Sequence, residues 1–148
     1  MNKSFRGRLA HMTSTDDILR IRLSTNDGLT GYEIVKFQLF PEKPGTSTGE
    51  NLVQIHSTKP TALPTEVNFN NPLILAVGFV GASTNNTQLA PIPSVVFDAV
   101  KINQDIYITH DDESGNASPV NFYLELKTVK LDLNEATVAT LKDMRGRE

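Results

Sequence analysis

Apolar and polar residues alternate along most of this chain, which is the period of a β-strand with one buried face. The alternation is clearest in residues 120–131, where Phe122, Leu124 and Leu126 are separated by more polar side chains. Segments rich in Gly, Pro, Asn and Thr separate the apolar runs and predict loops. The sequence therefore predicts strands at residues 17–23, 31–40, 51–57, 66–69, 72–80, 94–100, 104–109 and 120–131.

The first two predicted strands flank a turn. Residues 17–23 and 31–40 lie on either side of Asp27-Gly28, and this turn chemistry favours a hairpin with a loop longer than two residues. Period two then assigns the faces of the second strand. One face is expected to hold Val35, Phe37 and Leu39, and the other Ile34, Lys36, Gln38 and Phe40.

Two other strands carry a more specific expectation. Residues 72–80 are apolar on both faces, which predicts a central strand buried on both sides. In residues 120–131 the apolar positions are even up to Leu126 and odd from Val129. One extra residue must be absorbed between them, so we expect a β-bulge near 127–128.

The end of the chain has a helical pattern. Asp132 and Glu135 have the spacing of a capping box. Val138, Leu141 and Met144 follow at helical spacing and predict one apolar stripe. With seven or eight short strands before it, this helix completes an all-β, antiparallel β-sandwich. A jelly roll is the favoured version, and a Greek-key sandwich of another topology comes next.

The length of 148 residues fits one domain. The distribution of charge suggests segments within that domain. Net charge is −3 overall, but residues 1–22 carry +3 and the middle of the chain −7. We expect a basic N-terminal arm at 1–15, a β-sandwich at 16–131, and a C-terminal helix and tail at 132–148. The arm has little apparent reason to pack, so a chain starting at Thr15 is expected to fold.

The sequence contains few of the residue patterns that are typical of catalytic or metal sites. The absence of Cys excludes disulfides, zinc fingers, iron–sulfur sites and thiol nucleophiles. His11, His56 and His110 have no metal-ligand spacing, and no nucleotide or hydrolase motif occurs. The longest apolar run, residues 72–80, is far shorter than a membrane span. We expect no enzyme activity, no metal and no cofactor.

The loop after residue 109 and the tyrosines offer weaker candidates. The acidic cluster at 111–113 has the oxygen ligands that calcium prefers, but it fails the EF-hand spacing, and a solvated loop is the favoured interpretation. Its carboxylates would raise the proton affinity of His110, unless that residue is simply an exposed strand end. An aromatic platform for sugars or bases could come from Tyr32, Tyr107 and Tyr123.

Three runs of sequence carry a resemblance. They are STNDGLTGYEIVKF at 24–37, NQDIYITH at 103–110 with NFYLEL at 121–126, and NEATVATL at 134–141. The chain resembles small virion structural proteins of aquatic bacteriophages. The resemblance implies a β-sandwich or jelly-roll capsid, decoration or tail component that is located in the virion, acts in many copies and has no catalytic residue.

The charge pattern suggests where such a protein would make contacts. An acidic body with basic ends fits binding to copies of itself and to other virion proteins, although the charges could equally be only solvated. Nucleic acid bound by the basic arm is a less favoured partner. A carbohydrate- or receptor-binding β-sandwich is the alternative function. The predicted ionic contacts are Arg6, Arg8, Arg20 and Arg22. Their acidic partners on a neighbour would be Asp111, Asp112 and Glu113, or else Glu42 and Glu50.

Overall fold

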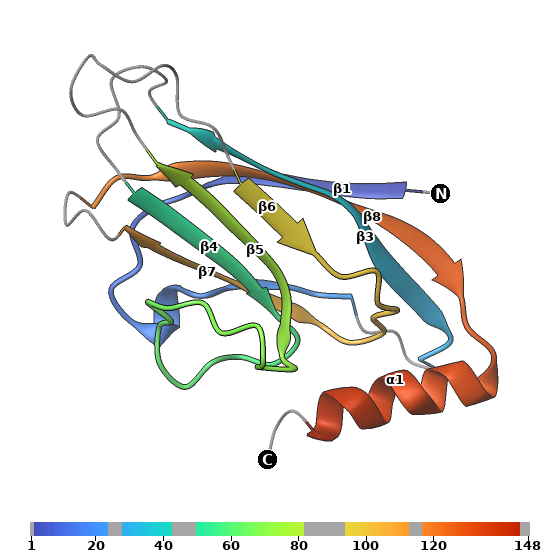
Figure 1. Ribbon diagram of the computed structural model, residues 1–148. Helices are drawn as coiled ribbons and strands as arrows, with labels where there is room; N and C mark the ends of the chain where they lie inside the picture. Colours follow the sequence, from blue (N-terminus) through green and yellow to red (C-terminus); the bar gives the residue numbers. More distant parts are fainter. Residues whose placement is uncertain (1, 24–27, 43–49, 82–93, 113–116, 146–148) are drawn as a thin grey trace.

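The computed structural model describes residues 2–23, 28–42, 50–81, 94–112 and 117–145. For residue 81 and residues 142–145 it describes the backbone only. Within these ranges, eight strands form two antiparallel sheets (Figure 1). The three-stranded sheet has the order β1 (Asn2–Leu9), β8 (Val120–Lys130) and β3 (Thr30–Pro41). The five-stranded sheet has the order β2 (Leu19–Ile21), β7 (Ile106–Asp112), β4 (Glu50–His56), β5 (Ile74–Gly81) and β6 (Ser94–Phe97). A 3-10 turn, η1 (Thr15–Asp17), precedes β2, and helix α1 (Leu133–Arg145) follows β8.

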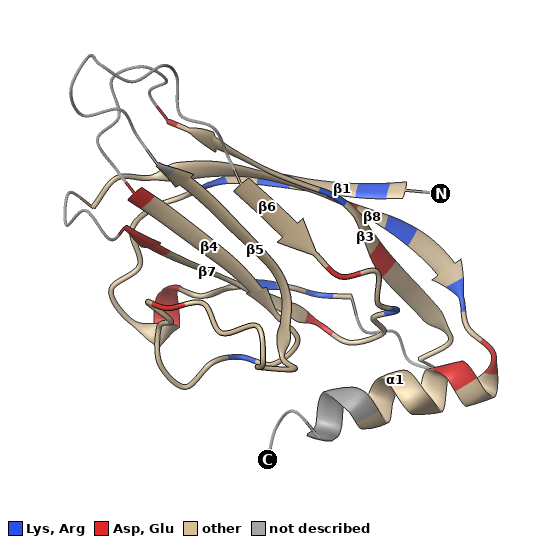
Figure 2. Ribbon diagram, viewed as in Figure 1, with Lys and Arg blue, Asp and Glu red and all other residues tan. Residues whose placement is uncertain are grey.

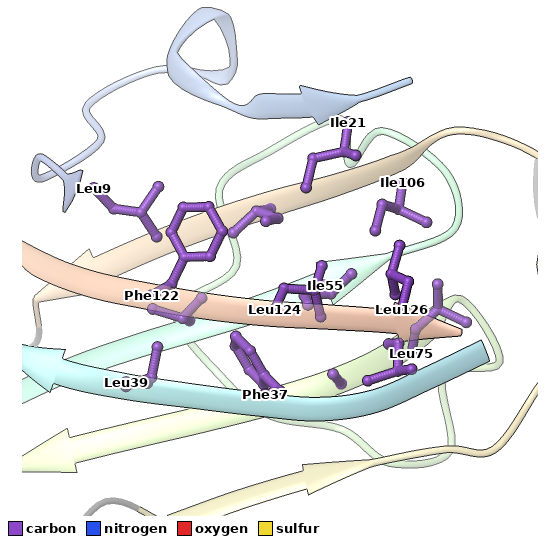
Figure 3. Packing of buried hydrophobic residues seen from close by; sticks show 14 of the residues in the cluster. Leu9, Ile21, Phe37, Leu39, Ile55, Leu75, Ile106, Phe122, Leu124 and Leu126 are labelled. Atoms are coloured by element: carbon purple, nitrogen blue, oxygen red, sulfur yellow. The ribbon is translucent and has the colours of Figure 1, made fainter. Parts of the chain in front are cut away.

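The two sheets pack face to face around one apolar core, as predicted for a sandwich. Phe37 of β3 and Leu124 of β8 contribute from the three-stranded sheet (Figure 3). Ile55 of β4 and Ile106 of β7 contribute from the five-stranded sheet, and both are completely buried. The sheets approach each other closely at Gly78 of β5, because a Cβ there would lie 2.7 Å from Leu39 Cδ1.

The predicted hairpin between residues 17–23 and 31–40 is wrong. Of the first segment only Leu19–Ile21 is a strand, and it pairs with β7 in the five-stranded sheet. The second segment forms β3, which pairs with β8 in the other sheet from Thr30 to Pro41. The chain crosses between the sheets here, because pairing two long strands buries more apolar surface than a local hairpin with a three-residue strand.

The N-terminal segment is not an arm without packing. Residues 2–9 form β1, and all eight pair with β8. Leu9 and Met12 are 5% exposed and belong to the core. The sequence did contain a signal, since Phe5 and Leu9 have the same parity and Arg6 and Arg8 the opposite one. The alternation is short and interrupted by Gly7, so the basic charge of the segment is the stronger feature of its sequence.

The predicted bulge lies on the partner strand. The register of β3 against β8 shifts between Ile34 and Lys36, so the extra residue is Val35 of β3. This shift reverses two predicted positions, because Ile34 is buried with Phe37 whereas Val35 is 41% exposed. Strand β8 itself runs without a register shift against β1 from residue 120 to 127.

The remaining predicted strands are mostly confirmed. β5 lies between β4 and β6, and Ile74 to Gly78 are buried on both faces of the strand. Phe79 is the exception at 39% exposure. Residues 66–69 form no strand, because they belong to the connection between β4 and β5.

The C-terminal helix begins where the capping pattern predicts. The carboxylate of Asp132 accepts a hydrogen bond of 2.7 Å from the backbone N–H of Glu135. Ala136 is buried, and its carbonyl accepts from Asn103 Nδ2 at 3.3 Å, so this side of α1 docks on the sandwich. The predicted stripe faces away, since Val138 is 60% exposed.

Candidate binding face

The outward face of the three-stranded sheet carries two rows of polar and aromatic side chains. Alternation along each strand sends Phe122, Leu124 and Leu39 into the core and their neighbours outward. Strand register aligns these neighbours across β1, β8 and β3. One row is Arg6, Tyr123 and Gln38, and the next is Arg8, Asn121 and Phe40.

These six residues line a hollow of about 930 Å³, which we call the outer groove. Gly7 and the core residues Phe37, Leu39 and Phe122 of the same strands also border it. Its far border reaches Val95 of β6. Phe40 is 62% exposed, which is unusual for a ring of this size on a sheet surface. Figure 2 shows that Lys and Arg residues occur along β1 and β8, the strands that form much of this face.

The cations of this face differ in what they contact. The Arg8 Nε donates to Glu42 Oε1 at 2.9 Å, so a carboxylate of the same chain neutralises it. Lys36 Nζ lies 5.7 Å from the centroid of the Tyr123 ring, a cation–π distance. Arg6 is exposed and has no ion pair within the part of the chain that the structure describes.

The other two predicted arginines lie elsewhere. Arg20 Nε donates to Asp105 Oδ2 at 2.7 Å, and this hydrogen bond raises the pKa of the guanidinium. The second oxygen of Asp105 accepts from the backbone N–H of Leu23 at 2.8 Å. Arg22 is exposed just beyond β2. The four arginines therefore do not converge on one site, and Arg8 and Arg20 bind acids of their own chain.

The predicted acidic partners also divide. Asp112 is 4% exposed, and its two oxygens accept from the backbone N–H groups of Glu50 at 2.9 Å and Ser118 at 2.7 Å. This carboxylate holds the ends of two connections together within the chain. Asp111 is partly exposed, and Glu113 lies outside the described residues. Among the residues described, no cluster of three or more His, Asp or Glu could hold a metal ion.

His110 is neither an exposed strand end nor a group with raised proton affinity. It is 1% exposed, and burial lowers its pKa despite the two aspartates beside it. Its Nδ1 lies 3.1 Å from the carbonyl of Ala10 and its Nε2 2.7 Å from Asn51 Oδ1. The ring thus attaches the connection after β1 to strands β7 and β4.

The three tyrosines form no common platform. Tyr32 is buried in the core and its hydroxyl accepts from Lys3 Nζ at 3.3 Å. Tyr107 belongs to β7 in the five-stranded sheet, whereas Tyr123 belongs to β8 in the other sheet. Only Tyr123 lies in the outer groove. The sequence showed its outward parity, but not that Arg6 and Gln38 would flank it.

Comparison with known proteins adds no relative: no protein-family model, curated protein or solved structure matches this chain. None of the described helices is long and apolar enough to cross a membrane. The features that point to a function are therefore the strand order, the exposed surfaces and the outer groove.

Proposed function

We propose that this chain is a virion structural protein with a capsid, cement or decoration role. The strand order carries the proposal. β1 lies beside β8, β2 beside β7 and β4 beside β5, which is the order produced when an antiparallel ribbon folds over into a jelly roll. β6 departs from the pattern, because it pairs with β5 and not with β3. Jelly rolls are common in viral capsid proteins, and the sequence resemblance points the same way.

An exposed apolar helix face supports the role of self-association. Val138 is 60% exposed and Leu141 47%, on the side of α1 that does not dock on the sandwich. Leu133, in the first turn, is 75% exposed. Exposed apolar groups that lie together mark contact surfaces, so copies of this chain or other virion proteins are the proposed partners. In this role the chain needs no catalysis and no cofactor.

Nucleic acid remains the less favoured partner in this proposal. Arg6 and Arg8 were expected on an arm that could follow a phosphate backbone. They belong instead to β1, whose eight residues pair with β8. An arm held in a sheet presents its cations on one flat face, and Arg8 is already neutralised by Glu42.

The test is the assembly state of the purified chain. Analytical ultracentrifugation and negative-stain images should reveal rings, shells or other oligomers. Val138→Glu should reduce association, while Thr137→Glu, exposed on the same helix, should not. A wild-type chain that stays monomeric at high concentration would contradict the proposal. If both variants assemble like the wild type, the contact lies on another surface.

The outer groove favours a second candidate, a carbohydrate-binding β-sandwich module. Tyr123 presents a ring among the amides of Gln38 and Asn121, and sugars present both apolar C–H faces and hydroxyl groups. Glycan-array binding that is lost in Tyr123→Ala and kept in Tyr107→Ala would support this function. Tyr107 is the matched control, because it lies on the other sheet.

A further inference from the structure

We propose that the outer groove binds an oligosaccharide that carries a carboxylate, with Arg6 pairing to the carboxylate and Tyr123 packing on the sugar ring. The inference rests on the second candidate function and specifies its ligand class. The groove has room for such a ligand at about 930 Å³, within the range of known small-molecule sites.

Arg6 supplies the charge that selects an acid. Among the cations of this face, Arg8 binds Glu42, and Lys36 lies over the Tyr123 ring, where a bound sugar would displace it. Lys127 is exposed on the same face, two pairs of residues further along β8 than Tyr123. Arg6 is exposed with no ion pair among the described residues, so its guanidinium is free to bind a ligand. A guanidinium presents two parallel N–H groups that match the two oxygens of a carboxylate.

The row that contains Arg6 has the other groups a sugar requires. Arg6, Tyr123 and Gln38 occupy three neighbouring strands, so the two outer positions are about 10 Å apart across the tyrosine. A pyranose ring on Tyr123 would therefore reach Arg6 with a carboxylate on one side and Gln38 with hydroxyl groups on the other. The amides of Gln38 and Asn121 both donate and accept, as vicinal hydroxyls require.

The face does not suit a long polyanion. Glu42 is paired with Arg8 beside the groove. Glu125 accepts a hydrogen bond of 2.7 Å from Asn2 on the neighbouring strand. A nucleic acid would bring several phosphates past these two carboxylates, with only Arg6, Lys36 and Lys127 as cations of this face that have no ion pair among the described residues. Binding to a nucleic acid backbone usually depends on many cations, so a ligand with isolated carboxylates fits better.

The experiment begins with a glycan array that contains uronic-acid, sialic-acid and neutral glycans. We expect binding to carboxylated glycans. The strongest ligand is then measured by calorimetry beside its methyl ester, which removes the charge and keeps the sugar. Esterification should weaken binding about tenfold, and Arg6→Gln should do the same. Arg22→Gln is the matched control, an exposed arginine near the other sheet, and should bind like the wild type.

The other possible results show whether the acidic ligand alone is wrong or the carbohydrate-binding function as well. Binding to neutral glycans alone, lost in Tyr123→Ala, would overturn the acidic ligand and leave the carbohydrate function in place. Binding to no glycan would overturn both. If the Arg6 and Arg22 variants lose affinity equally, the ligand does not bind in the outer groove. If a single-stranded DNA oligonucleotide binds more strongly than any glycan, with a steep salt dependence, the ligand of the groove is a nucleic acid and not a sugar.

Discussion

The outward faces of the two sheets are built differently. On the five-stranded sheet, Leu52, Gln54 and His56 point away from the core, yet all three are at most 6% exposed. The connection 57–73 contacts this face, since the carbonyl of Glu66 accepts from Gln54 Nε2 at 2.9 Å, and Leu52 packs with Ile74 and Val77 of β5. On the three-stranded sheet, the outward side chains of Arg6, Lys36 and Phe40 are exposed, and no described segment covers them.

The difference separates a face used for stability from a face available for binding. Covering one sheet removes β4 from water on both sides, which stabilises the fold through burial. The uncovered face adds little burial and keeps charged and aromatic groups in contact with solvent. A ligand or partner is therefore expected on the three-stranded sheet, while substitutions that unfold the protein should cluster on the other.

Removal of residues 1–14 should have the largest effect. The three-stranded sheet would lose the eight pairs between β1 and β8, and the core would lose Leu9 and Met12. The carbonyl of Ala10 beside His110 would also be lost. We expect no cooperative unfolding transition in circular dichroism melts. A truncated chain that melts like the parent would show that β1 is not part of the stable sheet.

Val77→Asp should be severe, and Val96→Asp should not. The two residues are direct partners on β5 and β6, but Val77 is 7% exposed beside Leu52 and Val96 is 53% exposed. An unpaired carboxylate at Val77 should cost at least about 3 kcal/mol, against about 1 kcal/mol or less at Val96. Urea denaturation measures both. Equal costs would mean that the two positions do not differ in burial.

Acid should weaken the covered face through His56. Burial lowers the pKa of this side chain from 6.5 to about 4. The unfolded chain takes up a proton near pH 6.5 and the folded chain does not, so stability present above pH 6.5 is lost as the pH falls toward 4. Between pH 7 and pH 5 the loss should be about 2 kcal/mol.

His56→Phe is the control for this pH dependence, because it has a similar size and no titrating group. The free energy of unfolding of both proteins is measured in urea at pH 7 and pH 5. The loss in the variant should be smaller than the loss in the parent by about 2 kcal/mol. If the parent and the variant lose stability equally, another group causes the acid sensitivity.

Gly78→Ala probes a close approach between the two sheets. The added Cβ would lie 2.7 Å from Leu39 Cδ1 and 3.1 Å from the Phe37 ring, both in the core. Overpacking of this kind costs about 1–3 kcal/mol. Gly7→Ala, whose Cβ would lie 3.1 Å from the Phe122 ring, is the milder comparison. A thermal melt in which Gly78→Ala is neutral would show that the Leu39 side chain or the sheets shift at no cost.

Arg8→Gln on the open face should have the smallest effect. The ion pair with Glu42 joins side chains that are 55% and 33% exposed, and solvent screens such pairs. We expect a loss below about 1 kcal/mol, and smaller still at high salt. A larger loss, unchanged by salt in urea titrations, would indicate that this face contributes to the fold after all.

The sequence predicted elements well where the local pattern was strong. Strand β8 and the cap of α1 lie where alternation and the Asp132–Glu135 spacing placed them, because both signals depend on neighbouring residues. It failed for β2 and β3, since a turn between two strands does not determine whether they pair. It also failed at Val35, because only the partner strand shows which residue is extra.

The candidate site shows the same limit. Sequence parity placed Tyr123 outward, and charge selected Arg6 and Arg8 as contact residues. The sequence alone thus determined a β-sandwich, the inward residues of β8 and the C-terminal helix, since period and capping are local properties of the chain. Which strands are neighbours was decided only by the tertiary structure, because pairing depends on the total surface buried by segments far apart in sequence. That pairing joins Arg6 to Tyr123 across 117 positions of the chain and leaves their face open.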